Sequence, residues 1–251
     1  MDHGLGIVAD AGSGGAHTSR TVMLRELTLL LAACPPGATK QDYVAAILED
    51  NVLSKRSDST RHRSLRYLRE LYVLDPASPV FRTLRDLWCL DPKAQPLLAL
   101  ECALARDPLL RATAPTVLAL PEGAPVDAAM LAKSVTERYP NSYSPPVAEK
   151  IGRNTASSWT QSGHVRSRTK KIRVRVNPRP PAVAIALFLG YLSDARGASL
   201  FETMWAQALD APKHALLERA FAAAQRGLIE FRQAGDVVEV GFRWLLRPVE
   251  G

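Results

Sequence analysis

The chain has 251 residues, of which 47% are hydrophobic and 23% charged, and its formal net charge is +7. Such a composition is typical of a globular protein with a buried core. Cys34, Cys89 and Cys102 are odd in number, sit among apolar residues and lack metal-ligand spacing, which argues against a disulfide framework and favours a reducing cytoplasm. The longest apolar run, residues 182–192, is too short to cross a bilayer and predicts a buried helix.

Residues 1–19 are rich in glycine and lack the basic start, apolar stretch and cleavage site of a secretory signal. Gly12–Gly15 are not followed by the Lys-Ser/Thr pair of a phosphate-binding loop. We therefore expect a flexible leader over residues 1–19.

Three helices are predicted between residues 20 and 74. Apolar residues recur on one arc over Thr21–Cys34, as in an amphipathic helix. Thr39 is a predicted N-cap for a short second helix, with Asp42 as its capping-box partner. The third helix is expected to run from Ser57 or Asp58 to Leu74.

The third predicted helix turns hydroxyls and guanidiniums outward in its N-terminal half. This layout is typical of a helix-turn-helix unit, whose recognition helix reaches base edges with that half. Arginine can bind guanine through two hydrogen bonds, and free helix N–H groups can hold a phosphate. A three-helix bundle with a purely structural role fits the same pattern. The candidate DNA contacts are Lys55, Arg56, Ser57, Ser59, Thr60, His62, Arg63 and Arg66.

The middle of the chain predicts a helical connector that is poor in groups able to do chemistry. Its helices are expected at Pro79–Leu90, Lys93–Ala105 and Pro108–Leu120. The Pro-Glu-Gly-Ala-Pro stretch at 121–125 is the best candidate for a domain boundary. It separates an N-terminal domain, residues 20–120, from a C-terminal winged-helix-like domain, residues 126–251.

The C-terminal part is expected to be helical with a terminal β-hairpin. Helices are predicted at Val126–Arg138, Pro145–Ser162, Pro181–Asp194, Leu200–Leu209 and Lys213–Gly227. Two extended runs joined by Gln-Ala-Gly-Asp predict a hairpin over residues 229–242, as in a winged helix. The fold class is therefore mainly α, with helix-turn-helix or winged-helix units at both ends and a small β component.

Residues 150–179 carry nine Lys or Arg residues and no acid. The positive electrostatic field of such a cluster attracts polyanions. The alternation in residues 171–176 predicts part of a strand over residues 165–176, with Ile172, Val174 and Val176 packed and the basic residues outward. A solvated strand edge is the alternative. The candidate phosphate contacts are Arg166, Arg168, Lys170, Lys171, Arg173, Arg175 and Arg179.

No motif for catalysis, a metal or a cofactor is found. The five histidines are scattered, no Cys/His pair has zinc spacing, and the carboxylates do not cluster. Trp159, next to the basic segment, is expected to anchor the core. We therefore predict a protein that is not an enzyme.

The segment Asn-Val-Leu-Ser-Lys-Arg-Ser-Asp-Ser-Thr-Arg-His-Arg, residues 51–63, resembles the Asn-x-Leu-x-Lys-Arg-Ser-x-x-Thr segment of the BrxA family of BREX bacteriophage-exclusion systems. Residues 103–111 are also similar, and the resemblance covers roughly residues 20–210. It implies an all-helical, non-catalytic DNA-binding protein that works beside a BREX methyltransferase and ATPases. By the motif, Lys55 to Thr60 would form the turn and the start of a recognition helix.

These observations together predict a double-stranded DNA-binding accessory protein of a phage-defence system, without a membrane partner. If about seven basic residues neutralise phosphates, the logarithm of the association constant for DNA, log K, falls against log salt concentration with a slope of about −6. Two alternatives stay open. One is an RNA-binding, antitermination-like helical protein, and the other is a scaffold whose basic strand docks an acidic protein.

Overall fold

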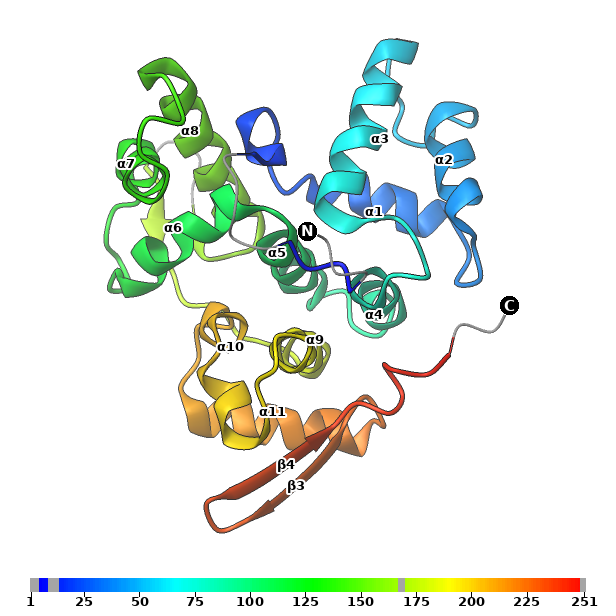
Figure 1. Ribbon diagram of the computed structural model, residues 1–251, viewed down its shortest axis with the longest axis vertical. Coiled ribbons are helices and arrows are strands. Elements are labelled where there is room, and N and C mark those ends of the chain that lie inside the picture. The colour runs from blue at the N-terminus through cyan, green and yellow to red at the C-terminus, as the bar shows by residue number, and fades with distance from the viewer. Residues whose placement is uncertain (1–4, 9–13, 167–169, 249–251) are drawn as a thin grey trace.

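The computed structural model describes residues 5–8, 14–166 and 170–248. They form mainly α-helices with a small β component, as the sequence predicts, and the β component consists of two antiparallel sheets of two strands each. In Figure 1, three groups of helices surround the central helix α5 (Gln95–Arg106). None of the helices in this part of the chain is both long and apolar enough to span a membrane.

The first group lies at the upper right of Figure 1 and contains the three helices predicted first. They are α1 (Leu24–Ala33), α2 (Lys40–Leu48) and α3 (Asp58–Tyr72). The Thr39–Asp42 capping box is confirmed, with the Asp42 N–H donating to Thr39 Oγ1. Ser57 caps α3 by accepting the Thr60 N–H at 3.3 Å. Hydroxyl and carboxylate caps satisfy helix N–H groups that otherwise lack partners, which explains why both helices begin here.

The connector helices form the centre of the molecule. They are α4 (Pro79–Trp88), α5 and α6 (Pro108–Ala119). Every residue of α5 from Leu97 to Ala105 is buried. Helix α5 contacts α3, α4, α6, α8 (Pro145–Gln161) and α9 (Pro180–Leu192), so it joins all three groups. Full burial of each leucine contributes roughly 1.5–3 kcal/mol.

The second group lies at the upper left of Figure 1, where α7 (Ala128–Arg138) packs along α8 (Pro145–Gln161). Gly152 permits this close packing, because a Cβ there would lie 2.1 Å from the Ala128 carbonyl oxygen. Trp159 is fully buried, and its Nε1–H donates to Thr113 Oγ1 at 2.8 Å. The prediction that Trp159 anchors the core is confirmed.

The β-structure beside α8 is shorter than the predicted strand over residues 165–176. Strand β1 (Val165–Arg166) pairs with β2 (Ile172–Arg173). Backbone hydrogen bonds also join Gly123 and Ala124 to Arg173, so the stretch expected to separate two domains pairs with β2. Proline and glycine exclude a helix in this stretch, but they leave carbonyls and some N–H groups available for strand-like pairing.

The third group lies at the bottom of Figure 1 and ends in the hairpin. Its elements are α9 (Pro180–Leu192), η2 (Gly197–Glu202), α10 (Met204–Ala208), α11 (Lys213–Gln225), β3 (Glu230–Ala234) and β4 (Val237–Gly241). The predicted helix at Leu200–Leu209 is interrupted at Thr203, whose hydroxyl caps α10. Helix α9 is buried from Pro180 to Gly190 and packs on α4 and α5, so one hydrophobic core spans both halves of the chain.

The N-terminal segment differs from the expected flexible leader in the residues that the structure describes. Residues 16–18 form a short 3₁₀ helix, η1, and His17 is fully buried. The His17 ring contacts Asp107 Oδ2 through Nδ1 and Ser158 Oγ through Nε2, each at 2.8 Å. Burial alone would raise the pKa of Asp107, but attraction to His17 and hydrogen bonds outweigh it and hold that pKa below 3.8.

A second histidine, His164, is buried against Trp159. Its Nε2–H donates to the Ala208 carbonyl at 2.8 Å, and its Nδ1 lies 2.9 Å from Ser162 Oγ. Burial lowers the pKa of His164 from 6.5 to about 4, although the Ala208 carbonyl and Asp210 oppose this shift. The folded protein therefore keeps this ring neutral at pH values where the unfolded chain protonates it.

Because the unfolded chain binds the additional proton, we expect the free energy of unfolding to fall as the pH drops from 6.5 towards 4. Between pH 7.5 and pH 5, His164 lowers the free energy of unfolding by about 2 kcal/mol. Urea unfolding of the wild type and His164→Gln at both pH values checks this. The exposed His62→Gln variant is the control. Equal pH dependence in wild type and His164→Gln would contradict the assignment.

Candidate nucleic-acid interface

The exposed face of α3 carries most of the predicted N-terminal contacts. Its exposed members are Arg56, Ser57, Ser59, His62, Arg63 and Arg66, while Thr60 and Lys55 are half-buried. The turn before α3 is held by Asn51, whose side chain accepts from the Lys55 N–H at 2.8 Å and donates to the Lys55 carbonyl at 3.1 Å. Asn51 and Ser54 both adopt left-handed backbone conformations with φ of 51°. The start of α3 therefore has a defined orientation.

The cations on this face differ in the partners they have. Lys55 Nζ forms an ion pair with Glu26 of α1 at 2.9 Å, which fixes the turn to α1. Arg56 and Arg63 have no acidic partner among the described residues. Arg63 only approaches Thr60 Oγ1, at 3.4 Å. These two guanidiniums are therefore the ones most available to an external anion.

Two further side chains on α3 have weak partners within the helix. His62 lies 3.4 Å from Asp58, and Arg66 lies 3.6 Å from Glu70, both four residues apart and exposed. Such surface pairs contribute only a few tenths of a kcal/mol, so an anionic ligand can replace them. Arg66 also lies over the Tyr67 ring, 4.4 Å from its centroid.

The prediction that Arg173 faces outward is wrong. Arg173 is fully buried, and its Nη2 lies 2.7 Å from Asp210 Oδ1. Its Nε donates to the Val117 carbonyl at 2.9 Å, and its Nη1 donates to the Val174 carbonyl at 2.5 Å. A planar guanidinium with five donors can use several acceptors at once, which offsets the cost of burying its charge.

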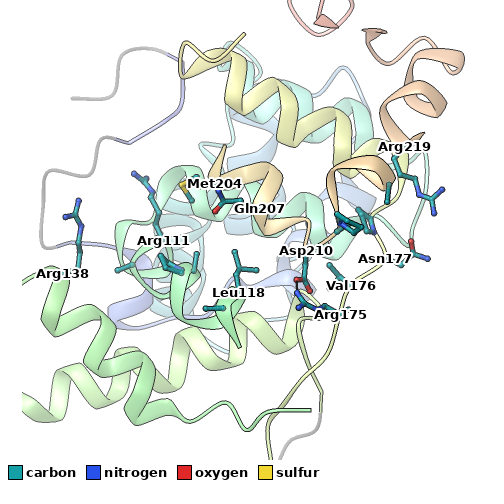
Figure 2. A pocket seen from close by; sticks show the side chains of 18 residues that line it. Arg111, Leu118, Arg138, Arg175, Val176, Asn177, Met204, Gln207, Asp210 and Arg219 are labelled. Atoms are coloured by element: carbon teal, nitrogen blue, oxygen red, sulfur yellow. Dashed lines mark hydrogen bonds and ion pairs between the residues drawn. The ribbon is translucent and has the colours of Figure 1, made fainter. Parts of the chain in front are cut away.

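Other basic residues of this segment also face internal partners. Arg175, half-exposed, pairs with the same Asp210 carboxylate, as Figure 2 shows. Arg179 Nε lies 2.9 Å from Asp91 Oδ2, which joins the start of α9 to the loop between α4 and α5. Lys171 Nζ donates to Thr160 Oγ1 at 3.0 Å, and partial burial lowers the Lys171 pKa.

The remaining predicted contacts of the basic segment are Arg166 and Lys170, which are exposed. Arg168 lies outside the described residues. In the described part of the segment, Arg166 and Lys170 are thus the exposed cations without an acidic partner, where the sequence predicts a row of outward-facing ones. Asp210 and Asp91, which the sequence analysis did not single out, neutralise much of the segment.

Neither a protein-family model nor a curated protein matches the chain. Within the described ranges, no group of three or more His, Cys, Asp or Glu side chains could hold a metal ion. The site therefore rests on its own geometry: the exposed, basic N-terminal half of α3 and two exposed cations near β1 and β2.

The buried pair predicts a large effect of Asp210→Asn on stability. This change leaves Arg173 buried without its carboxylate, and removing one partner of a buried pair costs about 3–5 kcal/mol. Asp194→Asn is a matched control, because Asp194 is fully exposed and shares the left-handed backbone of Asp210. We expect the control to change the unfolding free energy by less than about 0.5 kcal/mol. Similar small losses in both variants, measured by denaturant unfolding, would contradict the role of the pair.

Proposed function

We propose that the chain is a non-catalytic, double-stranded DNA-binding protein that contacts DNA through α3. The observation that carries this proposal is a pair of exposed guanidiniums, Arg56 and Arg63, that have no acidic partner among the described residues and lie beside hydroxyls at the capped start of α3. A helix that presents arginine and hydroxyl groups from its N-terminal half fits the major groove. Asn51 and the Lys55–Glu26 pair hold this half in place before DNA arrives.

The unit differs in one respect from a compact helix-turn-helix. Residues 49–57 separate α2 from α3, whereas the usual turn has three or four residues. The longer turn places Arg56 and Ser57 on the exposed side, directly ahead of α3. In the proposed complex these two residues contact the phosphates at the edge of the groove into which α3 inserts.

The proposed setting is a BREX-type phage-exclusion system in the cytoplasm. The support is the resemblance of residues 51–63 and 103–111 to BrxA segments, with a methyltransferase and ATPases as the implied partners. A deletion experiment tests this setting. In a host that carries the complete defence gene set, the gene for this chain is deleted and then restored either as wild type or as Arg56→Ala/Arg63→Ala. If the wild type restores defence and the double variant does not, both the setting and the DNA contact are supported.

The internal pairing of the basic segment lowers the expected salt dependence. With Arg56, Arg63, Arg66, Arg166 and Lys170 as the phosphate contacts, the slope of log K against log salt is about −4 to −5. Fluorescence anisotropy with labelled random-sequence duplex DNA across a salt series measures it. A slope of −6 or steeper would mean that cations now assigned to internal pairs also bind phosphates. An affinity independent of salt would exclude the proposed interface.

The double variant Arg56→Ala/Arg63→Ala should weaken duplex binding by about 50-fold at 0.1 M salt, since each lost phosphate contact contributes nearly tenfold. Lys133→Ala/Arg153→Ala is the matched control, because it removes two exposed cations of α7 and α8. The control should bind like wild type. Equal losses in both variants would show that only net charge matters, and preferential binding of single-stranded RNA in competition would favour an RNA-binding protein.

A further inference from the structure

A large cleft lies away from α3, between α6 on one side and α10 and the start of α11 on the other. Its volume is about 1230 Å³. The segment at residues 175–178, between β2 and α9, closes one end of it. Figure 2 shows arginines spread along the cleft, with Arg111 and Arg138 towards one end and Arg175 and Arg219 towards the other.

The floor of the cleft is apolar, and most of its side chains are small. Helix α6 contributes alanines, Pro115 and Leu118, and α10 contributes Met204; Ala211, just before α11, and Ala215, in its first turn, complete the floor. Small side chains leave room for larger apolar side chains to be inserted from outside. No aromatic residue lines the cleft in the part of the chain that the structure describes, so this lining offers no stacking surface for bases.

Arginines outnumber carboxylates among the described residues around this floor. Four are arginines and one, Asp210, is a carboxylate, which already contacts both Arg173 and Arg175. Arg111 is held at the rim by donating to the carbonyls of Leu104 at 2.9 Å and Val8 at 2.8 Å. Arg219, half-buried on α11, has no acidic partner among the residues that the structure describes.

We propose that this cleft binds an acidic amphipathic helix of a partner protein. Apolar side chains at i, i+3, i+4 and i+7 of such a helix would occupy the apolar floor. Its carboxylates would pair with Arg219, and Arg–carboxylate pairs are strong and directional. The cleft exceeds the usual 300–1,000 Å³ of a small-molecule site, which favours a peptide segment.

The cleft and the α3 face use different residues. None of the exposed α3 contacts lines the cleft. A partner helix in the cleft and DNA on α3 can therefore be bound together, so the chain would link an acidic partner to DNA. This proposal does not depend on DNA binding, and the two are tested separately.

The test uses the full chain and a fluorescein-labelled designed peptide of about five helical turns, with leucine on one face and glutamate on the other. We expect saturable binding, measured by anisotropy. The same peptide with lysine for glutamate, or with serine for leucine, should bind at least about tenfold more weakly, because it lacks one of the two matching surfaces.

Two variants locate the site. Arg219→Glu should weaken the acidic peptide about tenfold or more, and Ala119→Glu, which puts a carboxylate on the exposed edge of the floor, should do the same. Arg226→Glu reverses the charge of an exposed residue just beyond α11 and outside the cleft. This variant should bind the acidic peptide like wild type. All three variants should keep wild-type duplex DNA affinity and thermal stability.

Three results would overturn the proposal. The first is no saturable binding of the acidic peptide to wild type. The second is an equal loss in Arg219→Glu and Arg226→Glu, which would show that only overall charge matters. The third is a labelled oligothymidine that binds wild type and loses its affinity only in the cleft variants, which would make the occupant a nucleic acid.

Discussion

The buried contact between Arg173 and Asp210 joins parts of the molecule that lie far apart in the chain. Arg173 belongs to β2, its Nε reaches the Val117 carbonyl at the end of α6, and Asp210 lies between α10 and α11. Burying one of these charges without the other would cost several kcal/mol, so the two side chains must become buried together. It fixes α6 relative to α10 and α11, and therefore also the two walls of the arginine-lined cleft.

This constraint changes where the positive charge of the protein can act. The densest run of cations is largely committed to Asp210, Asp91 and Thr160. Besides scattered cations such as Arg166 and Lys170, two surfaces that could each hold a partner keep cations that face outward: the N-terminal half of α3 and the cleft between α6 and α11. The first carries hydroxyls and suits a duplex, and the second has an apolar floor and suits a protein helix.

Local signals in the sequence predicted the local structure well. The Thr39–Asp42 capping box and the apolar run that became α9 act within a few residues, so they can be recognised without knowledge of the fold. The ion pair of Arg175 could not be predicted in this way, because its partner Asp210 lies 35 residues away. Likewise, the His17 ring contacts Ser158, 141 residues away, and the glycine-rich sequence around His17, which has no helical pattern, predicts only a flexible leader.

Hydrogen–deuterium exchange of the full chain, with and without duplex DNA, tests the central claim most directly. The claim is that the basic segment at residues 171–179 holds the structure together while α3 meets the DNA. It predicts slow exchange at residues 171–175 in the free protein, because Arg173 and Val174 donate backbone hydrogen bonds, and additional protection on DNA addition at residues 55–66. Fast exchange at residues 171–175 in the free protein, with DNA-induced protection there and none at residues 55–66, would contradict it.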